Sequence, residues 1–238
     1  MVSLDHNSYY NHKDWENKRN ILRFLIRYIG VPLLAKLDKV DGLENVPGEG
    51  PGILLINHIS FLDSLIVLHS MPRNIVPLAK KEVYDYPVVG IFPKLWGVVP
   101  INRDQLDRKA LGQITAILKA GEIILVAPEG TRHNELHEGR VGVAYLASRT
   151  GAPVIPVAIT GSKGFPALRT SKRWKEPGVH IRIGRLFRYH TDLRRARKDK
   201  LRLMTDEAMY ILASLLPENL RGVYSELTKA TQETIEWL

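Results

Sequence analysis

The chain has 238 residues, of which 45% are hydrophobic and 25% are charged, as in a folded globular protein that buries its own core. It contains no cysteine, which excludes disulfide scaffolds, thiolate metal sites, iron–sulfur clusters and cysteine nucleophiles. The net charge of +9 indicates an anionic partner, whether nucleic acid, phospholipid or a phosphorylated small molecule.

The sequence of residues 1–40 predicts a helical segment that associates with a membrane. The first twenty residues are polar and lack the apolar run of a secretory signal. Residues 21–37 are the most lipophilic stretch, but this run of 17 is interrupted by charges and a proline, whereas a membrane span needs about 20 mainly apolar residues. Arginines four residues apart among large aliphatic side chains are typical of a helix lying among lipid headgroups. An amphipathic helix packed on the protein's own domain fits the pattern equally well.

The remainder of the chain alternates short β-branched runs with helical patterns. Strands are predicted at residues 53–56, 75–78, 98–101, 123–127, 154–159 and 179–183, and helices at residues 60–70, 104–120, 141–150 and 192–216. This alternation predicts an α/β fold with a mostly parallel sheet flanked by helices. A turn signal at Asp41-Gly42 separates the two parts. We therefore expect an N-terminal segment of residues 1–40 and an α/β domain of residues 41–238.

A polar motif follows the first predicted strand. Asn57-His58 stands at the exit of the strand, and Asp63 comes five residues after His58, on the first turn of the next helix. Open α/β sheets bind ligands at the carboxyl ends of their strands. The carboxylate can bond one imidazole nitrogen and leave the other to accept a proton, so that a hydroxyl of the substrate can act as nucleophile. The alternative is that Asp63 is an ordinary helix-capping residue.

The third and fourth predicted strands each lead to arginine. The third leads to Arg103, and the fourth leads to the run Glu129-Gly130-Thr131-Arg132. Guanidinium groups bind phosphate through a bidentate fork, so arginines at two strand ends indicate a phosphate clamp. Gly130 lets backbone N–H groups approach the anion, and Glu129 is expected to orient one arginine or to bind a substrate hydroxyl. Either arginine alone would be an ordinary surface residue.

Four ordered blocks resemble the phospholipid and glycerol acyltransferase family, which contains the bacterial 1-acyl-glycerol-3-phosphate acyltransferases. Residues 57–63 match an N-H-x₄-D block, residues 97–103 a G-x-x-x-I-x-R block, residues 128–132 a P-E-G-T-R block and residues 154–157 a V-I-P-V block. Ala127 and His133 stand where the family usually has Phe and Ser. The loop after Arg132 is also shorter than usual, a difference that bears on the acceptor.

The resemblance implies an O-acyltransferase of phospholipid biosynthesis. A fatty acyl group would pass from a thioester donor, acyl-CoA or acyl carrier protein (acyl-ACP), to the free hydroxyl of lysophosphatidic acid. His58 would be the general base and Asp63 its orienting partner, while Arg103 and residues 129–132 would hold the acceptor's phosphate. Lys80 resembles a family stretch near that site. No metal and no cofactor are implied, and the enzyme would lie on the cytoplasmic face of the cell membrane.

The basic excess is confined to residues 163–202, which hold 14 Lys or Arg against three acids, while the rest of the chain has a net charge of −2. This segment can serve the thioester donor or an anionic membrane surface, and part of it is expected to be merely solvated. It lacks a nucleic-acid-binding signature, so no nucleic acid partner is expected. Two alternatives stay open: the same chemistry on another lysolipid or glycolipid, and a non-catalytic basic module that binds membrane or nucleic acid.

Overall fold

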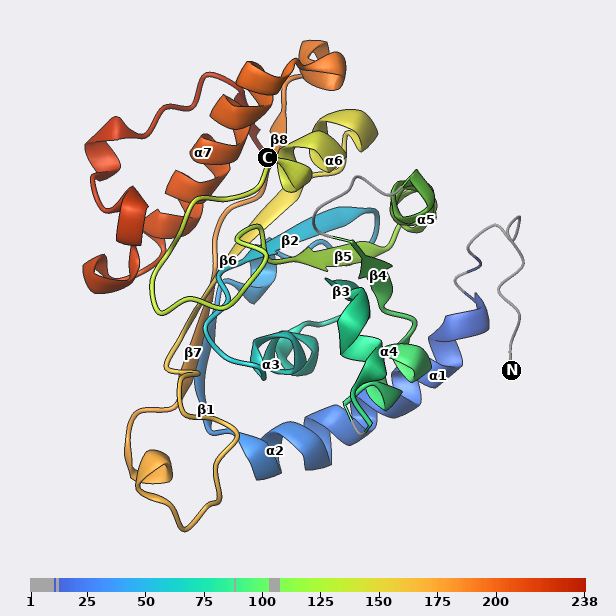
Figure 1. Cartoon of the computed structure of the whole chain (residues 1–238), viewed down its shortest axis with the longest axis vertical. Coiled ribbons are helices and arrows are strands. Elements are labelled where there is room, and N and C mark those ends of the chain that lie inside the picture. The colour runs from blue at the N-terminus through green and yellow to red at the C-terminus, as the bar shows by residue number, and fades with distance from the viewer. Residues whose placement is uncertain (1–10, 12, 88, 103–107) are drawn as a thin grey trace.

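The computed structural model describes residue 11 and residues 13–87, 89–102 and 108–238. Its centre is a sheet with helices on both faces (Figure 1). The strands are β1 (Leu37–Asp41), β2 (Gly52–Ile56), β3 (Ile75–Lys80), β4 (Val99–Ile101), β5 (Ile123–Val126), β6 (Val154–Thr160), β7 (Val179–Ile183), β8 (Phe187–Tyr189) and β9 (Ile235–Trp237). The helices are α1 (Lys13–Leu25), α2 (Val31–Leu34), α3 (Asp63–Ser70), α4 (Ile91–Trp96), α5 (Arg108–Lys119), α6 (Gly142–Thr150) and α7 (Lys198–Ser214).

The strand order is β1-β7-β6-β2-β5-β3-β4, with β8 and β9 added in antiparallel fashion beside β6. The five strands from β6 to β4 are parallel to one another, and β7 is antiparallel to β6. The α/β prediction with a mostly parallel sheet is confirmed. Because parallel neighbours run the same way, β2, β5, β3 and β4 all end at one edge of the sheet.

Helices cover both faces because the central strand is apolar on both sides. Ile53 and Leu55 of β2 pack in one core with side chains of α5, α6 and α7, whereas Leu54 and Ile56 pack in a second core with α3 and α4. Such continuous apolar strands are expected in a parallel sheet that is covered on both faces. The double coverage leaves the ends of the strands, rather than their faces, to bind a ligand.

The six predicted strands and the four predicted helices of the α/β domain are present. Residues 104–107 of the second predicted helix lie outside the described residues, and the first and last predicted helices are shorter than expected. The first begins at Asp63 rather than at residue 60, because the Asp63 carboxylate binds the backbone of the turn before it. The last is helical only from Lys198, since residues 191–195 form a separate 3₁₀ turn and Arg197 is extended. Helix α4 and strands β1, β8 and β9 escaped prediction.

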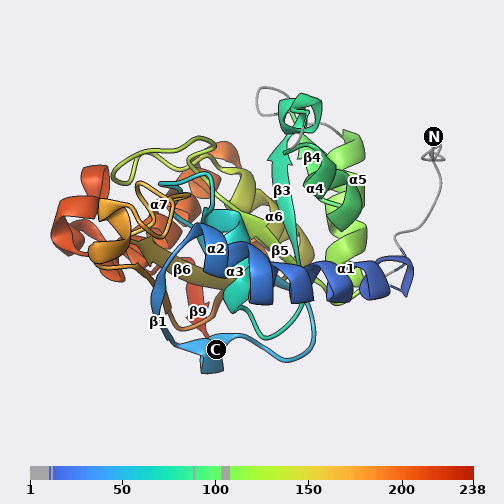
Figure 2. The same cartoon turned by 90° about the horizontal axis from the view of Figure 1, so that it is seen from below.

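The N-terminal segment forms α1, a π-helical turn at residues 26–30 and α2, which together run beneath α3 and α4 (Figures 1 and 2). Arg19 of α1 is fully buried, and its guanidinium donates to the backbone oxygen of Trp96 and pairs with Glu122. Strand β1 spans the boundary expected between residues 40 and 41, so residues 37–40 pair within the sheet. In the described part of the chain, every helix is too short or too polar to cross a bilayer.

Candidate active site

His58 and Asp63 form a close pair just beyond the end of β2. The His58 Nδ1 atom lies 2.9 Å from Asp63 Oδ2, which also accepts hydrogen bonds of 2.7 Å from the backbone N–H groups of Ile59 and Ser60. Asp63 is fully buried, while the His58 side chain keeps 19% of its surface exposed. An acceptor at Nδ1 fixes the tautomer that carries its proton there. The Nε2 atom is then left as a proton acceptor.

Asn57 anchors the same strand end from the other side, a role that the sequence did not reveal. Its side-chain nitrogen donates to the backbone oxygen of Ile159 at 2.9 Å, and its oxygen accepts the Ile159 N–H at 2.7 Å. This pair of bonds ties the exit of β2 to β6, its neighbour in the sheet. The position of a buried amide directly after four apolar residues is the signal that marks it.

Glu129, just after β5, braces the backbone around His58. Its Oε2 accepts the His58 N–H at 3.3 Å, and its Oε1 accepts the His137 N–H at 2.8 Å. Burial raises the pKa of Glu129 to about 7; the two N–H groups oppose this rise, and the charge of Asp63 adds to it. We expected Glu129 to orient an arginine or bind a substrate hydroxyl, but its hydrogen bonds in the described structure go to the backbone. Glu129 therefore links the backbone of His58 to that of His137.

Gly130 has a φ of +74°, a left-handed conformation that favours glycine. Its own N–H donates to the backbone oxygen of Ala127 at 3.1 Å and therefore closes a turn. The N–H of Gly130 is therefore used within the turn, and the expectation that Gly130 lets other backbone N–H groups approach an anion stays a prediction. The turn instead directs the following residues, Thr131 and Arg132, to the surface, where both are exposed.

An open polar pocket of about 310 Å³ lies beside His58. It is lined by Ile59, Arg132, His133, Asn134, Glu135 and His137. The His133 N–H donates to the backbone oxygen of His58 at 2.9 Å, and the rings of His133 and His137 stack with their centroids 3.8 Å apart. Burial and the nearby His137 lower the pKa of His133. The pocket thus combines Arg132 with two histidines, His133 and His137.

The remaining predicted substrate-binding residues are Lys80 and Arg103. Lys80 is the last residue of β3, is exposed, and pairs in register with Ile101 of β4. It therefore stands at the same sheet edge as His58 and Glu129, separated from β2 by one strand. Arg103 lies outside the described residues.

Many arginines of the basic segment bind other parts of the chain. Arg169, Arg173, Arg182 and Arg185 donate hydrogen bonds to backbone oxygens, and Arg188 and Arg202 pair with carboxylates. These contacts fasten the loop after β6 and the strands that follow it. Part of the basic segment therefore stabilises the fold, and the segment is not one uniform surface for anions.

A sequence model of the family described as "Acyltransferase" matches residues 39–160, which is half of the chain. The chain belongs to the acyltransferase family. The matched region contains His58, Asp63, Glu129 and Arg132, so the pair and the pocket described above lie inside the part that the family shares.

Several relatives in the acyltransferase family are 1-acyl-sn-glycerol-3-phosphate acyltransferases. A chloroplastic one from Brassica napus is 32% identical over 130 residues, covering 52% of this chain and 37% of that protein. One from Borreliella burgdorferi is 31% identical over 130 residues, covering 53% of this chain and 52% of that protein. The chain thus matches only about a third to a half of the length of these relatives. The crystal structure of the 1-acyl-sn-glycerophosphate acyltransferase PlsC from Thermotoga maritima has the same fold, with a TM-score of 0.55 and 22% identity over 93% of this chain and 81% of that one.

Proposed function

We propose that this acyltransferase moves a fatty acyl group from a thioester donor, acyl-CoA or acyl-ACP, to the free hydroxyl of lysophosphatidic acid and so forms phosphatidic acid. The observation that carries the proposal is the His58–Asp63 pair, which is held in one tautomer and adjoins Ile59 and His133, two residues that line the polar pocket. The names of the relatives support the choice of acceptor.

The chemistry follows from the open Nε2 atom of His58. This nitrogen takes the proton of the acceptor hydroxyl as the oxygen attacks the thioester carbonyl carbon. The carbon–sulfur bond then breaks, and the proton passes from the imidazolium to the leaving thiolate, so that no proton is gained or lost overall. General-base help of this kind accelerates a reaction by about 10²–10⁴-fold. Asp63 contributes by stabilising the imidazolium and by keeping the ring in place.

The acceptor's phosphate is assigned to the pocket side of His58. Arg132 lines the pocket, and its guanidinium suits a phosphate monoester because it can bind two oxygens at once. The turn that ends at Gly130 presents Thr131 and Arg132 at the surface. Lys80, at the end of β3, and Arg103 would add positive charge for the phosphate, as the family resemblance implies.

The surface of α1 and α2 supports an attachment to the membrane. One face of this helical segment, with Ile26 and Val31, packs on the domain, and the Arg23 guanidinium donates to the backbone oxygen of Met71 at 2.5 Å. The opposite face exposes seven large apolar side chains: Ile21, Phe24, Leu25, Tyr28, Ile29, Leu33 and Leu34. One face of the segment is therefore part of the core, and the exposed apolar face supports the proposal of a lipid interface. We place the protein on the cytoplasmic face of the membrane, where thioester donors are available.

The loop between β6 and β7 connects this apolar face to the active site. The backbone oxygen of Phe165 in this loop accepts a hydrogen bond of 2.9 Å from the Ser60 hydroxyl, two residues from His58. Further along the loop, the Ala167 N–H donates to the backbone oxygen of Leu34 in α2 at 3.2 Å. Leu168 next to it is 79% exposed. A lysolipid held by the apolar face would therefore have its headgroup close to His58.

The proposal is tested by incubating the purified protein with a panel of acceptors and donors and identifying the products by mass spectrometry. The acceptors are lysophosphatidic acid, its dephosphorylated counterpart, other lysophospholipids and a glycolipid, each with acyl-CoA and with acyl-ACP. Acylation of lysophosphatidic acid in preference to the others is expected. Preference for an acceptor without a phosphate monoester refutes the choice of acceptor, and absence of any acylation refutes the enzymatic proposal.

A further inference from the structure

Residues 127–141, between β5 and α6, contain no helix or strand and carry most of the pocket. Long irregular connections of this kind are usually functional, and they keep a defined shape only where other parts of the chain hold them. We call these residues the catalytic loop. Toward the active site, it is held by two hydrogen bonds with the backbone of His58, one from the His133 N–H and one to the Glu129 carboxylate.

The opposite side of the catalytic loop is held by the chain that follows α7. The Leu136 N–H donates to the backbone oxygen of Leu220 at 2.9 Å, and its carbonyl accepts the Val223 N–H at 3.1 Å. The Leu136 side chain is buried in the core next to α7. Gly222 lies between these two bonds with a φ of +50°, and a Cβ atom there would collide with the Leu136 carbonyl oxygen. The two backbones therefore fit together only with glycine at this position.

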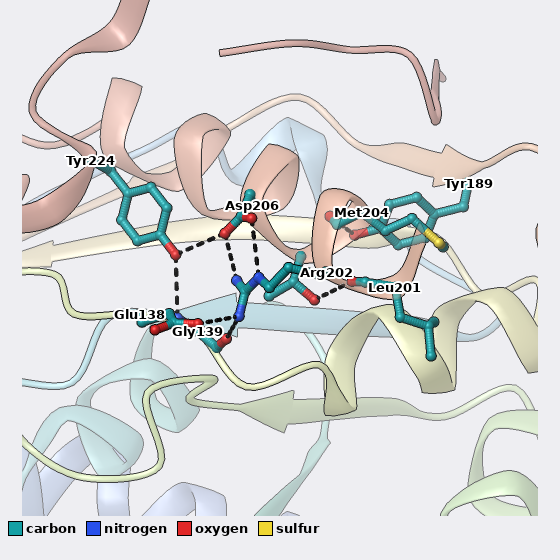
Figure 3. A network of polar contacts seen from close by, with 9 residues as sticks. Glu138, Gly139, Tyr189, Leu201, Arg202, Met204, Asp206 and Tyr224 are labelled. Atoms are coloured by element: carbon teal, nitrogen blue, oxygen red, sulfur yellow. Dashed lines mark hydrogen bonds and ion pairs between the residues drawn. The ribbon is translucent and has the colours of Figure 1, made fainter. Parts of the chain in front are cut away.

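Arg202 of α7 adds a second attachment two residues further along the loop (Figure 3). Its guanidinium donates to the Gly139 carbonyl at 2.7 Å and to the Glu138 carboxylate at 2.9 Å. Asp206 holds the same guanidinium through two bonds of 3.0 and 2.5 Å, so its direction is fixed.

Tyr224 completes this attachment. Its hydroxyl accepts the Gly139 N–H and donates to Asp206 Oδ1, both at 3.3 Å. Burial raises the pKa of Tyr224 to about 12, so the hydroxyl keeps the proton that it donates. Both backbone polar groups of Gly139 are thus bound by side chains from the C-terminal part of the chain.

We propose that Arg202, Asp206, Leu220, Val223 and Tyr224 form a C-terminal clamp that positions the catalytic loop for acyl transfer. Leu136, which the clamp holds, directly precedes His137, whose N–H binds Glu129, and Glu129 in turn binds the backbone of His58. The clamp residues lie beyond residue 160, where the match to the family ends. The inference rests on the proposed function, because positioning matters only if the loop serves the reaction.

The clamp differs from an ordinary surface ion pair in what it holds. Exposed ion pairs contribute little to the stability of a fold. The chain offers a matched control in Arg188 of β8, whose guanidinium makes the same two-bond contact with Glu236 at 2.9 and 2.7 Å. The Arg188 side chain is 44% exposed and that of Arg202 31% exposed, but Arg188 pairs only the short strands β8 and β9.

The first test compares Arg202→Met, Tyr224→Phe and the control Arg188→Met by amide hydrogen exchange and by kcat/KM with lysophosphatidic acid. In Arg202→Met, hydrogen exchange in residues 133–139 should be faster and kcat/KM should be lower, each by about tenfold or more. Loss of a charge-assisted hydrogen bond typically has an effect of this size. Tyr224→Phe should show a smaller change of both quantities in the same direction. This milder variant carries the test if Arg202→Met does not fold. Arg188→Met should match wild type in both measurements.

The second test is a double-mutant cycle between Arg202→Met and Glu129→Gln. If the clamp acts through the Glu129 link, Arg202→Met should cost much less in kcat/KM once Glu129 is already Gln. Fully additive losses, or loop exchange in Arg202→Met and Tyr224→Phe equal to that in Arg188→Met, overturn the proposal. Absence of acyl transfer by the wild-type protein refutes the proposed function instead. The hydrogen-exchange comparison then tests by itself whether the clamp holds the loop.

Discussion

Asp63→Asn removes one negative charge from the active site and changes the shape of the side chain very little. Asp63 Oδ2 accepts three hydrogen bonds, whereas Oδ1 is buried without a hydrogen-bond partner among the described residues. An asparagine that turns its oxygen toward the three donors keeps these bonds and places its nitrogen at the position of Oδ1. The substitution should therefore preserve the local backbone while it removes the charge that faces His58.

The size of the effect follows from the charge that develops on His58 during the reaction. Two unit charges about 4 Å apart at an effective dielectric constant of about 20 attract each other by about 4 kcal/mol. At about 1.4 kcal/mol per decade, loss of this attraction slows the reaction by about three decades. The imidazolium forms only after the acceptor has bound, so the loss should appear in kcat, with KM nearly unchanged.

The assay is steady-state formation of phosphatidic acid by purified Asp63→Asn, with thermal unfolding to verify the fold. Asp41→Asn is a matched control, because Asp41 Oδ2 lies 2.8 Å from His180 Nε2 in a second His–Asp pair, between β1 and β7. This control should keep the wild-type kcat. A kcat for Asp63→Asn within threefold of wild type, where the estimate requires about three decades, refutes the role given to the carboxylate.

Three further outcomes are expected. The pKa of Glu129 is raised from 4.5 to about 7 in the folded protein, so its contribution to stability is present below pH 4.5 and is lost by about pH 7, a change of about 3 kcal/mol. The free energy of unfolding of Glu129→Gln, measured with denaturant, should lack this change, and curves of unfolding free energy against pH that run parallel for the variant and wild type contradict it. Arg132→Ala should raise KM for lysophosphatidic acid about 10–150-fold, with a much smaller effect on the dephosphorylated acceptor; we expect the same of Arg103→Ala, and equal effects on both acceptors exclude phosphate recognition. Phe24→Ser should weaken flotation with anionic vesicles about tenfold or more, since Phe24 is 59% exposed on the apolar face; the control Leu43→Ser, at a 39% exposed residue outside that face, should float like wild type, and equal flotation of the two variants contradicts the assignment.

Local sequence patterns predicted the parts of the structure that depend on neighbouring residues. Strand β7 was predicted with its observed bounds. The His58–Asp63 pair could be predicted because its two members are only five residues and one turn apart. Strand β1 was missed because its sequence, LDKVD, mixes charged and apolar residues and is stabilised by pairing with β7, about 140 residues later in the chain. An edge strand of this kind carries too little apolar character to be recognised without its partner.

The role of Glu129 could not be predicted for a related reason. Its position after a strand indicated a site residue, but its hydrogen bonds go to backbone N–H groups, which every residue except proline possesses. The side-chain types in the sequence therefore do not reveal which N–H groups Glu129 binds. The same holds for Leu136, which is held by Leu220 and Val223 from more than eighty residues away.

The central claim is that His58 acts as the general base of an acyl transfer to lysophosphatidic acid. It is tested most directly by the rate at which purified wild type and His58→Ala form phosphatidic acid from lysophosphatidic acid and an acyl thioester, both at saturating concentration. The account predicts that the wild type forms this product and that His58→Ala is slower by about 10²–10⁴-fold while remaining folded. Equal rates for the two proteins, or no phosphatidic acid from the wild type with either donor, contradict it.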